Sequence, residues 1–312
     1  MAYFPLLKKL PPKFDVLIPF LQFEKELESE LTLHNYKIIY KTDRIFIVES
    51  VLEKPIWAQD YWPNSTGTPF DSKSVVIKTL KSKPVLGHYY DAGHKLGPNL
   101  IKELRNFEKR RIEFKSEFKF NYFVWTLIDD FLITCETPSS RYPSGWHEFV
   151  EDKTFPPNRA YLKLWEVFTL YDIHLDKTET VIDVGASPGG WSWVLSGLSR
   201  KVYSVDRADL DPKIAAIKNI ESSKQDAFNL DFTKLTECTW LFSDIICTPA
   251  RLYDLVADCM QNSNIQNFVC TLKFKGDCDF DMIKKFLAID PNSRIVHLYQ
   301  NKNEVTWIRQ TK

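Results

Sequence analysis

Four aspartates recur in the second half of the chain, at intervals of 23, 20 and 18 residues. They are Asp183, Asp206, Asp226 and Asp244, and each lies near the end of a short apolar run. Such runs read as strands, and the carboxyl ends of parallel strands meet at one edge of a sheet, where ligands bind. A single aspartate at a strand end is usually a helix cap or a turn residue. Four in register predict a ligand site, in which Asp206 is placed to hydrogen-bond a ribose diol.

A glycine-containing loop follows the first of these runs. Residues 181–191 read VIDVGASPGGW, so that a buried strand is expected to end at Gly185 and a helix to begin near Gly189. Glycines let the backbone approach a ligand, and a helix N-terminus offers free N–H groups. The spacing is neither the dinucleotide fingerprint nor a P-loop, which weakens both of those nucleotide-binding interpretations.

Two lysines and a glutamate add further ionisable groups. Lys273 ends an apolar strand, FVCTLK, where a charge needs a partner. Lys163 lies in an expected helix just before the sheet, and Glu304 opens the last strand. Taken singly, Lys163 reads as a surface lysine and Lys273 as a strand-end lysine that reaches water.

Strand-helix alternation must position these groups. Runs such as TVIDVG, KVYSVD and FVCTLK alternate with amphipathic stretches such as GGWSWVLSGL and RLYDLVADCM. This predicts an α/β fold with a mainly parallel sheet covered on both faces. The last two runs, RIVHLYQ and EVTWIRQ, are separated only by residues 301–303 and predict an antiparallel C-terminal hairpin.

The first half predicts a small α+β region. Residues 20–33 have a helical period that places Phe20, Phe23, Leu27 and Leu31 on one face, and residues 36–41 and 44–49 read as two strands. We expect an α+β unit over 1–66, a basic region over 67–140, a Ser-, Pro- and Gly-rich linker over 141–158, and the α/β domain over 159–312.

The charge of the chain is zero overall, with 41 basic and 41 acidic side chains, but it is unevenly placed. Residues 73–119 contain twelve Lys or Arg and five acids, a surplus of seven. A helix is expected over 99–111, and its basic residues read singly as a solvated helix face. As a stripe in a neutral protein they predict contact with RNA phosphates. The candidates are Lys102, Arg105, Lys109, Arg110 and Arg111.

The sequence also gives an expectation for the cellular compartment of the protein. The N-terminus lacks the apolar core of a signal peptide, and no run approaches the length of a membrane helix. The six cysteines show no zinc-ligand spacing and read as buried thiols. We expect a reduced, cytoplasmic protein without a metal or a membrane anchor.

These motifs resemble those of a known family. DVGASPGGWSWVL resembles the S-adenosylmethionine loop of the FtsJ-like ribose 2′-O-methyltransferases, which carry a Lys–Asp–Lys–Glu tetrad. RAYLK, SDIICTP, TLKFKG and NEVTW are similar to the four tetrad motifs in order and spacing, over about residues 155–312.

The resemblance implies a Rossmann-like methyltransferase sheet, S-adenosylmethionine as cofactor and Lys163, Asp244, Lys273 and Glu304 as the catalytic tetrad. It also implies a set of cofactor-binding residues, of which Gly185, Asp206 and Asp226 would hold the methionine, ribose and adenine parts. The full set is Asp183, Gly185, Ala186, Ser187, Pro188, Gly189, Gly190, Trp191, Asp206, Asp226 and Asp244.

Within that family the RlmM group, which methylates a cytidine ribose of large-subunit ribosomal RNA, is the closer resemblance. VYSVD, KQDAFNL and LYQNKNEVTW carry it, together with Pro249 five residues after Asp244. It implies a ferredoxin-like unit over 1–66 and a THUMP-like RNA-binding region over 67–140. The region between Trp62 and Tyr142 is short and departs from the group's pattern.

A ribose hydroxyl must lose a proton as it attacks a methyl group, and neutral Lys273 is the expected acceptor. Like-charge repulsion from Lys163 favours that neutral form, while Asp244 and Glu304 orient the lysines. The rivals are a base or protein methyltransferase, an RNA-binding or assembly factor with a non-catalytic methyltransferase fold, and, more distantly, a nucleotide-dependent dehydrogenase. The oligomeric state is left open.

Overall fold

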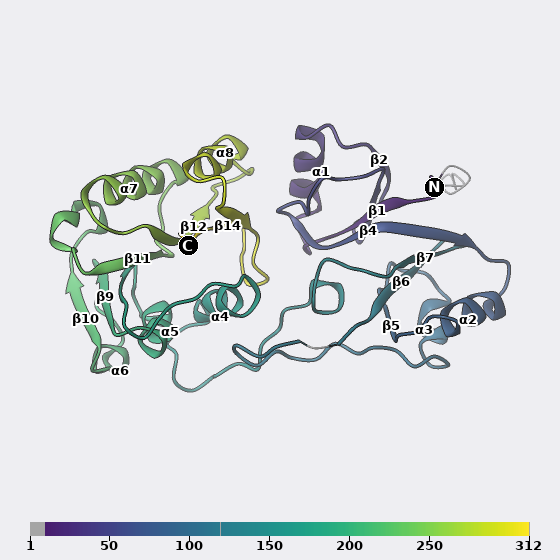
Figure 1. The fold of residues 1–312 in the computed structure, drawn as a ribbon, viewed down its shortest axis with the longest axis horizontal. Helices are drawn as coiled ribbons and strands as arrows, with labels where there is room; N and C mark the ends of the chain where they lie inside the picture. Colours follow the sequence, from purple (N-terminus) through teal and green to yellow (C-terminus); the bar gives the residue numbers. More distant parts are fainter. Residues whose placement is uncertain (1–9, 119, 312) are drawn as a thin grey trace. The chain divides into compact units, whose positions relative to one another are not determined.

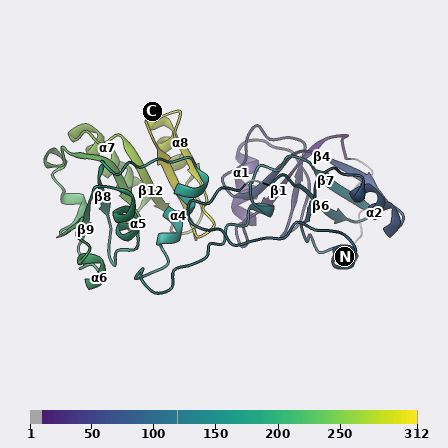
Figure 2. The same cartoon turned by 60° about the horizontal axis from the view of Figure 1, so that its bottom comes forward.

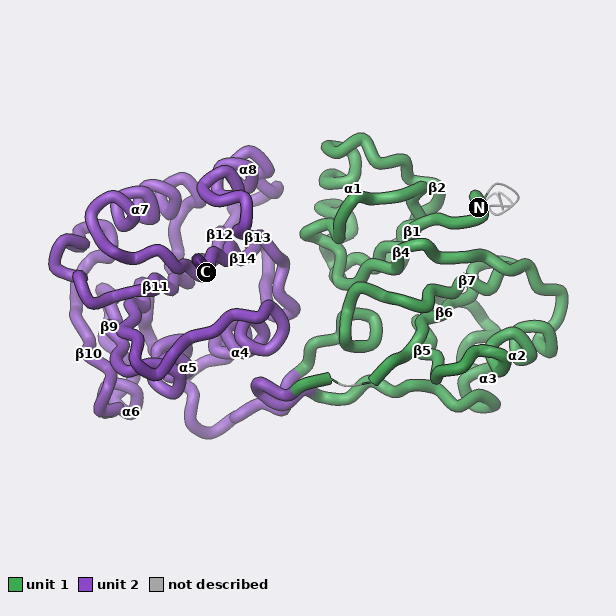
Figure 3. The backbone as a smooth tube through the Cα atoms, in the orientation of Figure 1, with its two compact units in different colours: residues 1–111, 117–148 green, residues 112–116, 149–312 purple. Residues whose placement is uncertain are grey.

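The computed structural model describes residues 10–118 and 120–311, in two compact units (Figures 1 and 3). Unit 1 comprises residues 1–111 and 117–148, and unit 2 comprises residues 112–116 and 149–312. The chain therefore passes three times from one unit to the other. The N-terminal residues 1–9, on which the leader interpretation rests, and Lys119 of the basic stripe lie outside the described residues.

Unit 2 is built on a seven-stranded sheet in the order β10-β9-β8-β11-β12-β14-β13. Its strands are β8 (Thr180–Val184), β9 (Lys201–Asp206), β10 (Ile220–Lys224), β11 (Cys238–Ser243), β12 (Asn267–Lys273), β13 (Arg294–Val296) and β14 (Glu304–Arg309). The pairs from β10 to β12 are parallel, whereas β14 is antiparallel to both β12 and β13. The expected Rossmann-like sheet with its antiparallel C-terminal hairpin is confirmed.

Helices cover both faces of this sheet, with α7 and α8 on one and α4 and α5 on the other (Figure 1). The helices are α4 (Tyr161–Leu170), α5 (Gly190–Leu198), α6 (Pro212–Ala215), α7 (Pro249–Asn262) and α8 (Phe280–Ile289), with 3₁₀ turns at η3 (Ala227–Asn229) and η4 (Phe232–Lys234). α7 buries Leu252, Leu255, Val256 and Cys259, which recur every three or four residues and so form one face. Each fully buried aliphatic side chain contributes about 1.5–3 kcal/mol.

Unit 2 also includes a short segment that lies, in the sequence, between the two parts of unit 1. We call residues 112–116 the strap. Ile112 pairs with Phe149 in an isolated bridge, and the ring of Phe114 stacks on Trp165 of α4 at 5.0 Å and 12°. The Lys115 N–H donates to Thr169 Oγ1 on the same helix. The strap is thus a packed part of unit 2.

Unit 1 is also a single seven-stranded sheet, in the order β2-β3-β1-β4-β7-β6-β5. Its strands are β1 (Phe14–Pro19), β2 (Ile38–Lys41), β3 (Phe46–Val48), β4 (Ala58–Pro69), β5 (Gly87–Tyr89), β6 (Phe123–Ile128) and β7 (Phe131–Cys135). Its helices are α1 (Glu24–Leu33), α2 (Lys73–Lys81) and α3 (Gly97–Leu100), with a 3₁₀ turn at η2 (Pro143–Gly145). Figure 2 shows α1 beside β1 and α2 beside the β6–β7 end.

Alternation along β6 separates two apolar cores. Phe123, Trp125 and Leu127 pack with α2 and α3, while Val124 and Ile128 pack with β1 and β3 on the other face. This is the side-chain period of a strand covered on both sides. The strands expected over 36–41 and 44–49 are present as β2 and β3, although the helix expected from Phe20 begins at Glu24.

The helix expected over 99–111 is wrong beyond Leu100. Leu100 and Leu104 pack in the core beside α2, whereas Phe107 packs in the other core. One helix face could not reach both cores, so the backbone extends. The Phe107 N–H then donates to the Gly87 carbonyl, and Asn106 Oδ1 accepts from the Tyr89 N–H.

Two of the expected domain boundaries also differ from the structure. The boundary at 66/67 falls inside β4, which continues from the first core to its pairing with β7. The expected linker begins inside unit 1, because Tyr142, Ser144 and Gly145 are buried there and Gln59 donates to the Ser144 carbonyl. In this segment serine and glycine form a tight turn and not a linker, since Ser144 and Gly145 both have positive φ.

Three smaller findings concern only the described part of the chain. None of its helices combines the length and apolar character needed to cross a membrane. Its six cysteines are free thiols. No cluster of three or more His, Cys, Asp or Glu in residues 10–118 and 120–311 could hold a metal ion.

Candidate active site

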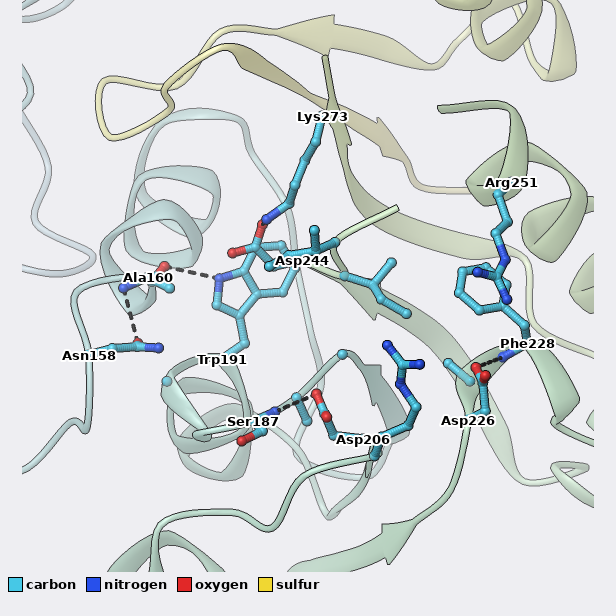
Figure 4. A pocket seen from close by; sticks show the side chains of 17 residues that line it. Asn158, Ala160, Ser187, Trp191, Asp206, Asp226, Phe228, Asp244, Arg251 and Lys273 are labelled. Atoms are coloured by element: carbon cyan, nitrogen blue, oxygen red, sulfur yellow. Dashed lines mark hydrogen bonds and ion pairs between the residues drawn. The ribbon is translucent and has the colours of Figure 1, made fainter. Parts of the chain in front are cut away.

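A pocket of about 350 Å³ opens at the carboxyl edge of the unit 2 sheet (Figure 4). That volume lies within the range of about 300–1,000 Å³ common for small-molecule sites. Gly185, Ala186, Ser187, Gly190, Trp191, Asp206, Asp226, Asp244 and Lys273 line it, as the sequence led us to expect. The loop after β8 forms its floor, and the ends of β9, β11 and β12 form its walls.

The backbone of the loop fits closely against its surroundings. Gly185 has φ +78°, and a Cβ there would lie 2.7 Å from the Ile245 Cα. Gly190 begins α5, and a Cβ there would lie 2.2 Å from Asn158 Oδ1. Glycine at these positions leaves room for the chain segments that frame the pocket.

Two aspartates fix the far side of the pocket. Asp206 ends β9, and its carboxylate accepts from the Ser187 N–H at 3.0 Å and the Ala208 N–H at 2.9 Å. Asp226 Oδ1 accepts from the Phe228 N–H at 3.1 Å (Figure 4). These bonds hold both carboxylates in place, and their remaining lone pairs can accept from a ligand.

Four ionisable side chains converge at the near side. Lys163 Nζ lies 3.0 Å from Asp244 Oδ1 and 2.6 Å from Glu304 Oε1, and Lys273 Nζ lies 2.9 Å from Asp244 Oδ1 and 3.7 Å from Glu304 Oε2. All four expected tetrad residues are therefore within one ion-pair network. Charged lysines and ionised carboxylates balance in it.

Neighbouring elements bring this tetrad together. Asp244 directly follows β11, Lys273 ends β12, and Glu304 opens β14, where it pairs in register with Lys273. Lys163 comes from the first turn of α4 on the covering layer. The antiparallel β14 is what places a glutamate opposite the strand-end lysine.

The two lysines are not equivalent. Burial disfavours the charged form of Lys163, but Asp244 and Glu304 outweigh burial and raise its pKa above the ordinary value. Lys163 therefore stays cationic at neutral pH. Its side chain is 8% exposed and does not line the pocket, whereas that of Lys273 is 22% exposed and points in beside Asp244 (Figure 4). Lys273 is the lysine that a pocket ligand meets.

Three expected cofactor residues lie elsewhere. Asp183 is inside β8 rather than at its end, and its carboxylate accepts from Ser192 Oγ at 2.6 Å in the core. Burial raises the pKa of Asp183 to about 7. Pro188 and Gly189 do not line the pocket, because a Cβ on Gly189 would point at Ile214 on the outer side of the loop. Their structural part is to shape the loop.

Several residues that line the pocket were not among the predicted ones. Asn158 Oδ1 accepts from the Ala160 N–H, and the Ala160 carbonyl accepts from Trp191 Nε1, so the segment before α4 closes one wall. Phe228 and Arg251 close the other, with the guanidinium carbon 3.6 Å from the ring centroid. The remaining missed residues are Arg207, Ala227, Ile245 and Ile246. The strand-end pattern signals none of them except Arg207, Ala227 and Ile245, which directly follow marked aspartates.

Comparison with known proteins agrees with this geometry. Residues 156–290 match the model of a family described as FtsJ-like methyltransferase. The α/β unit resembles the FtsJ-like methyltransferases. The match begins just before α4 and ends at α8, so it contains Lys163, Asp244 and Lys273 but not Glu304.

Curated relatives extend the likeness. A ribosomal RNA large subunit methyltransferase M from Thauera aminoaromatica is 27% identical over 165 residues, covering 48% of this chain and 45% of the relative. One from Teredinibacter turnerae is 31% identical over 180 residues, covering 52% and 51%. The chain thus spans about half the length of the curated relatives it matches. A solved rRNA methylase from Streptococcus thermophilus covers 44% of this chain and 91% of its own at 14% identity, and its TM-score of 0.33 carries no argument.

Proposed function

We propose that this protein transfers a methyl group from S-adenosylmethionine to a ribose 2′-hydroxyl of RNA. The convergence of Lys163, Asp244, Lys273 and Glu304 in one ion-pair network beside the pocket is the observation that carries the proposal. A base or protein methyltransferase needs the pocket but has no use for two lysines on one carboxylate pair. A dehydrogenase would need a different loop.

The residues present fit such a cofactor. The Gly185 loop leaves backbone room for a ligand at the head of α5. Asp206 offers carboxylate lone pairs to a ribose diol, and Asp226 to an amino group of a base. The acidic wall also suits a sulfonium cation. When bound, the cofactor supplies an electrophilic methyl carbon whose leaving group is a neutral thioether.

The chain's own residues then have two tasks, to align the hydroxyl and to take its proton. Lys273, in the pocket wall, accepts the proton at Nζ when it is neutral. Lys163 stays charged and holds Asp244 and Glu304 in place between the two lysines. Holding the hydroxyl in line with the methyl group supplies the larger part of the rate enhancement, because the leaving thioether needs no protonation.

The experiment uses the full chain with radiolabelled S-adenosylmethionine and RNA from a strain that lacks the gene. We expect label in RNA, and Lys273→Ala should lower its incorporation at least about 100-fold while cofactor binding by calorimetry persists. Lys284→Ala, an exposed lysine of α8, is the matched control and should keep full activity. Loss of cofactor binding together with activity would assign Lys273 a structural role.

We further propose a cytidine of large-subunit ribosomal RNA as the target, which would place the enzyme in the cytoplasm. The relatives named ribosomal RNA large subunit methyltransferase M support this. Mapping the labelled nucleotide tests it directly. Label on a base atom or on protein would contradict the ribose chemistry, and cofactor binding without any transfer would favour a non-catalytic RNA-binding factor.

A further inference from the structure

Unit 1 has a surface feature in which exposed apolar side chains adjoin part of the basic stripe. Two adjoining hollows of about 420 and 700 Å³ share Lys83, Val85 and Phe123 in their linings. We call them together the Phe120 groove, after the exposed phenylalanine that lines the larger hollow. Large apolar side chains are unusually open here, with Phe120 59%, Leu86 46% and Val85 39% exposed.

Phe120 is the outermost ring of an aromatic cluster. Its centroid lies 5.8 Å from that of Phe107 and 5.6 Å from that of Phe118, and Tyr122 stacks on Phe107 at 5.3 Å and 15°. The inner rings therefore hold one side of Phe120, while more than half of its surface remains open. A ring supported in this way is a ready platform for another planar group.

The charge of the groove favours an anionic partner. Its two acids are already paired, Glu136 with Lys83 at 2.7 Å and Glu103 with Lys73. Lys81 and Arg105 also line it, and within residues 10–118 and 120–311 neither forms an ion pair. Two unpaired cations in one hollow and an exposed ring in the adjoining one match the backbone and base of a nucleic acid strand.

We propose that the Phe120 groove binds an unpaired stretch of the RNA substrate, with a base stacked on Phe120 and phosphates near Lys81 and Arg105. The inference rests on the proposed RNA substrate and adds the form in which RNA is recognised. Duplex RNA keeps its bases stacked inside the helix and cannot offer one to an exposed ring, whereas loops and single strands can. Single-strand recognition also suits a reaction that needs an accessible ribose.

Binding without cofactor tests this apart from catalysis. Fluorescence anisotropy of the full chain would compare a labelled twelve-residue oligouridine with a twelve-base-pair RNA duplex. Phe120→Ala should weaken single-strand binding about tenfold or more, because base–aromatic stacking is worth about 1–3 kcal/mol. Phe120→Trp should keep single-strand binding near that of the unaltered protein. Duplex binding should change little in either variant. Phe155→Ala, an exposed phenylalanine of unit 2, is the matched control.

The cations have a separate signature. Arg105→Ala should lower the slope of log K against log salt by about one and weaken both RNAs alike. Unchanged single-strand binding in Phe120→Ala, or equal losses on single strand and duplex, would overturn the proposal. So would a Phe120-dependent self-association, seen by sedimentation, with RNA binding unaltered. If methyl transfer fails but Phe120-dependent binding holds, only the catalytic proposal falls.

Discussion

Single glycines determine whether the loop after β8 can pack closely against its neighbours. Gly185 combines a left-handed φ of +78° with contact against the backbone after β11, the segment that carries Asp244. A side chain there would push apart the loop after β8 and the segment after β11, both of which line the pocket. The requirement is therefore both conformational and steric.

Gly185→Ala should destabilise unit 2 by about 2 kcal/mol or more and weaken cofactor binding, because it adds backbone strain to a 2.7 Å clash. Thermal unfolding and calorimetry measure the two effects. Gly197→Ala in α5 is the control, since a Cβ there meets nothing within 4 Å and should stabilise the helix by about 0.5–1 kcal/mol. Equal behaviour of the two variants would refute the steric argument.

The sequence reveals some of the site residues but not others. Asp206, Asp244 and Lys273 could be found because a strand end is visible in the apolar pattern. Asn158 and Arg251 could not, because they reach the pocket through the packing of segments distant from its loop. Asp183 was misplaced by one strand position, and in a strand that shift turns a side chain to the opposite face.

The pairing of β12 with β14 holds the two halves of the tetrad in register. Asn303, next to Glu304, fastens this end of the pair. The side-chain amide of Asn303 donates to the backbone carbonyls of Phe274 and Gly276, and the backbone carbonyl of Asn303 accepts from the Phe274 N–H. Asn303, the residue before Glu304, is thus bonded to the segment that follows Lys273. We assign it a role in positioning these two side chains.

Asn303→Ala should lower the rate of methyl transfer about tenfold with little change in cofactor binding, because Lys273 and Glu304 lose their fixed separation. Asn303→Gln should recover part of the rate. The pH–rate profile should shift as well, since the charges around Lys273 move, and a purely structural loss would leave its shape unchanged. Asn262→Ala, at the exposed end of α7, is the control.

Element types could be predicted where one pattern continues over a whole segment. The βα alternation of unit 2 is such a case. The stretch from 99 to 111 is not, because its apolar residues serve two different cores. β4 could not be delimited either, since a strand of twelve residues that joins both parts of unit 1 has no period that marks its middle.

At the scale of the whole chain, unit 2 depends on the strap. Phe114→Ala removes the ring stacked on Trp165 and should destabilise the α4 region by about 1–2 kcal/mol. Hydrogen exchange followed by mass spectrometry should show faster exchange in α4 and unchanged protection in β6 and β7. Glu113→Ala, an exposed neighbour in the strap, should alter neither, and protection lost equally in both units would count against the assignment of the strap to unit 2.

The strap also sets an order of events on the ribosome. Phe114 leaves the ribosome about 50 residues ahead of Trp165, which corresponds to roughly 3–10 seconds of synthesis. Phe114 has no ring partner from unit 2 during that time, and Ile112 has no bridge partner until Phe149 is made, directly after the last residue of unit 1. Unit 1 is therefore completed while an apolar segment of the other unit, already made, still lacks its own partners. The strap of unit 2 is therefore made before the last part of unit 1, and the rest of unit 2 only after it.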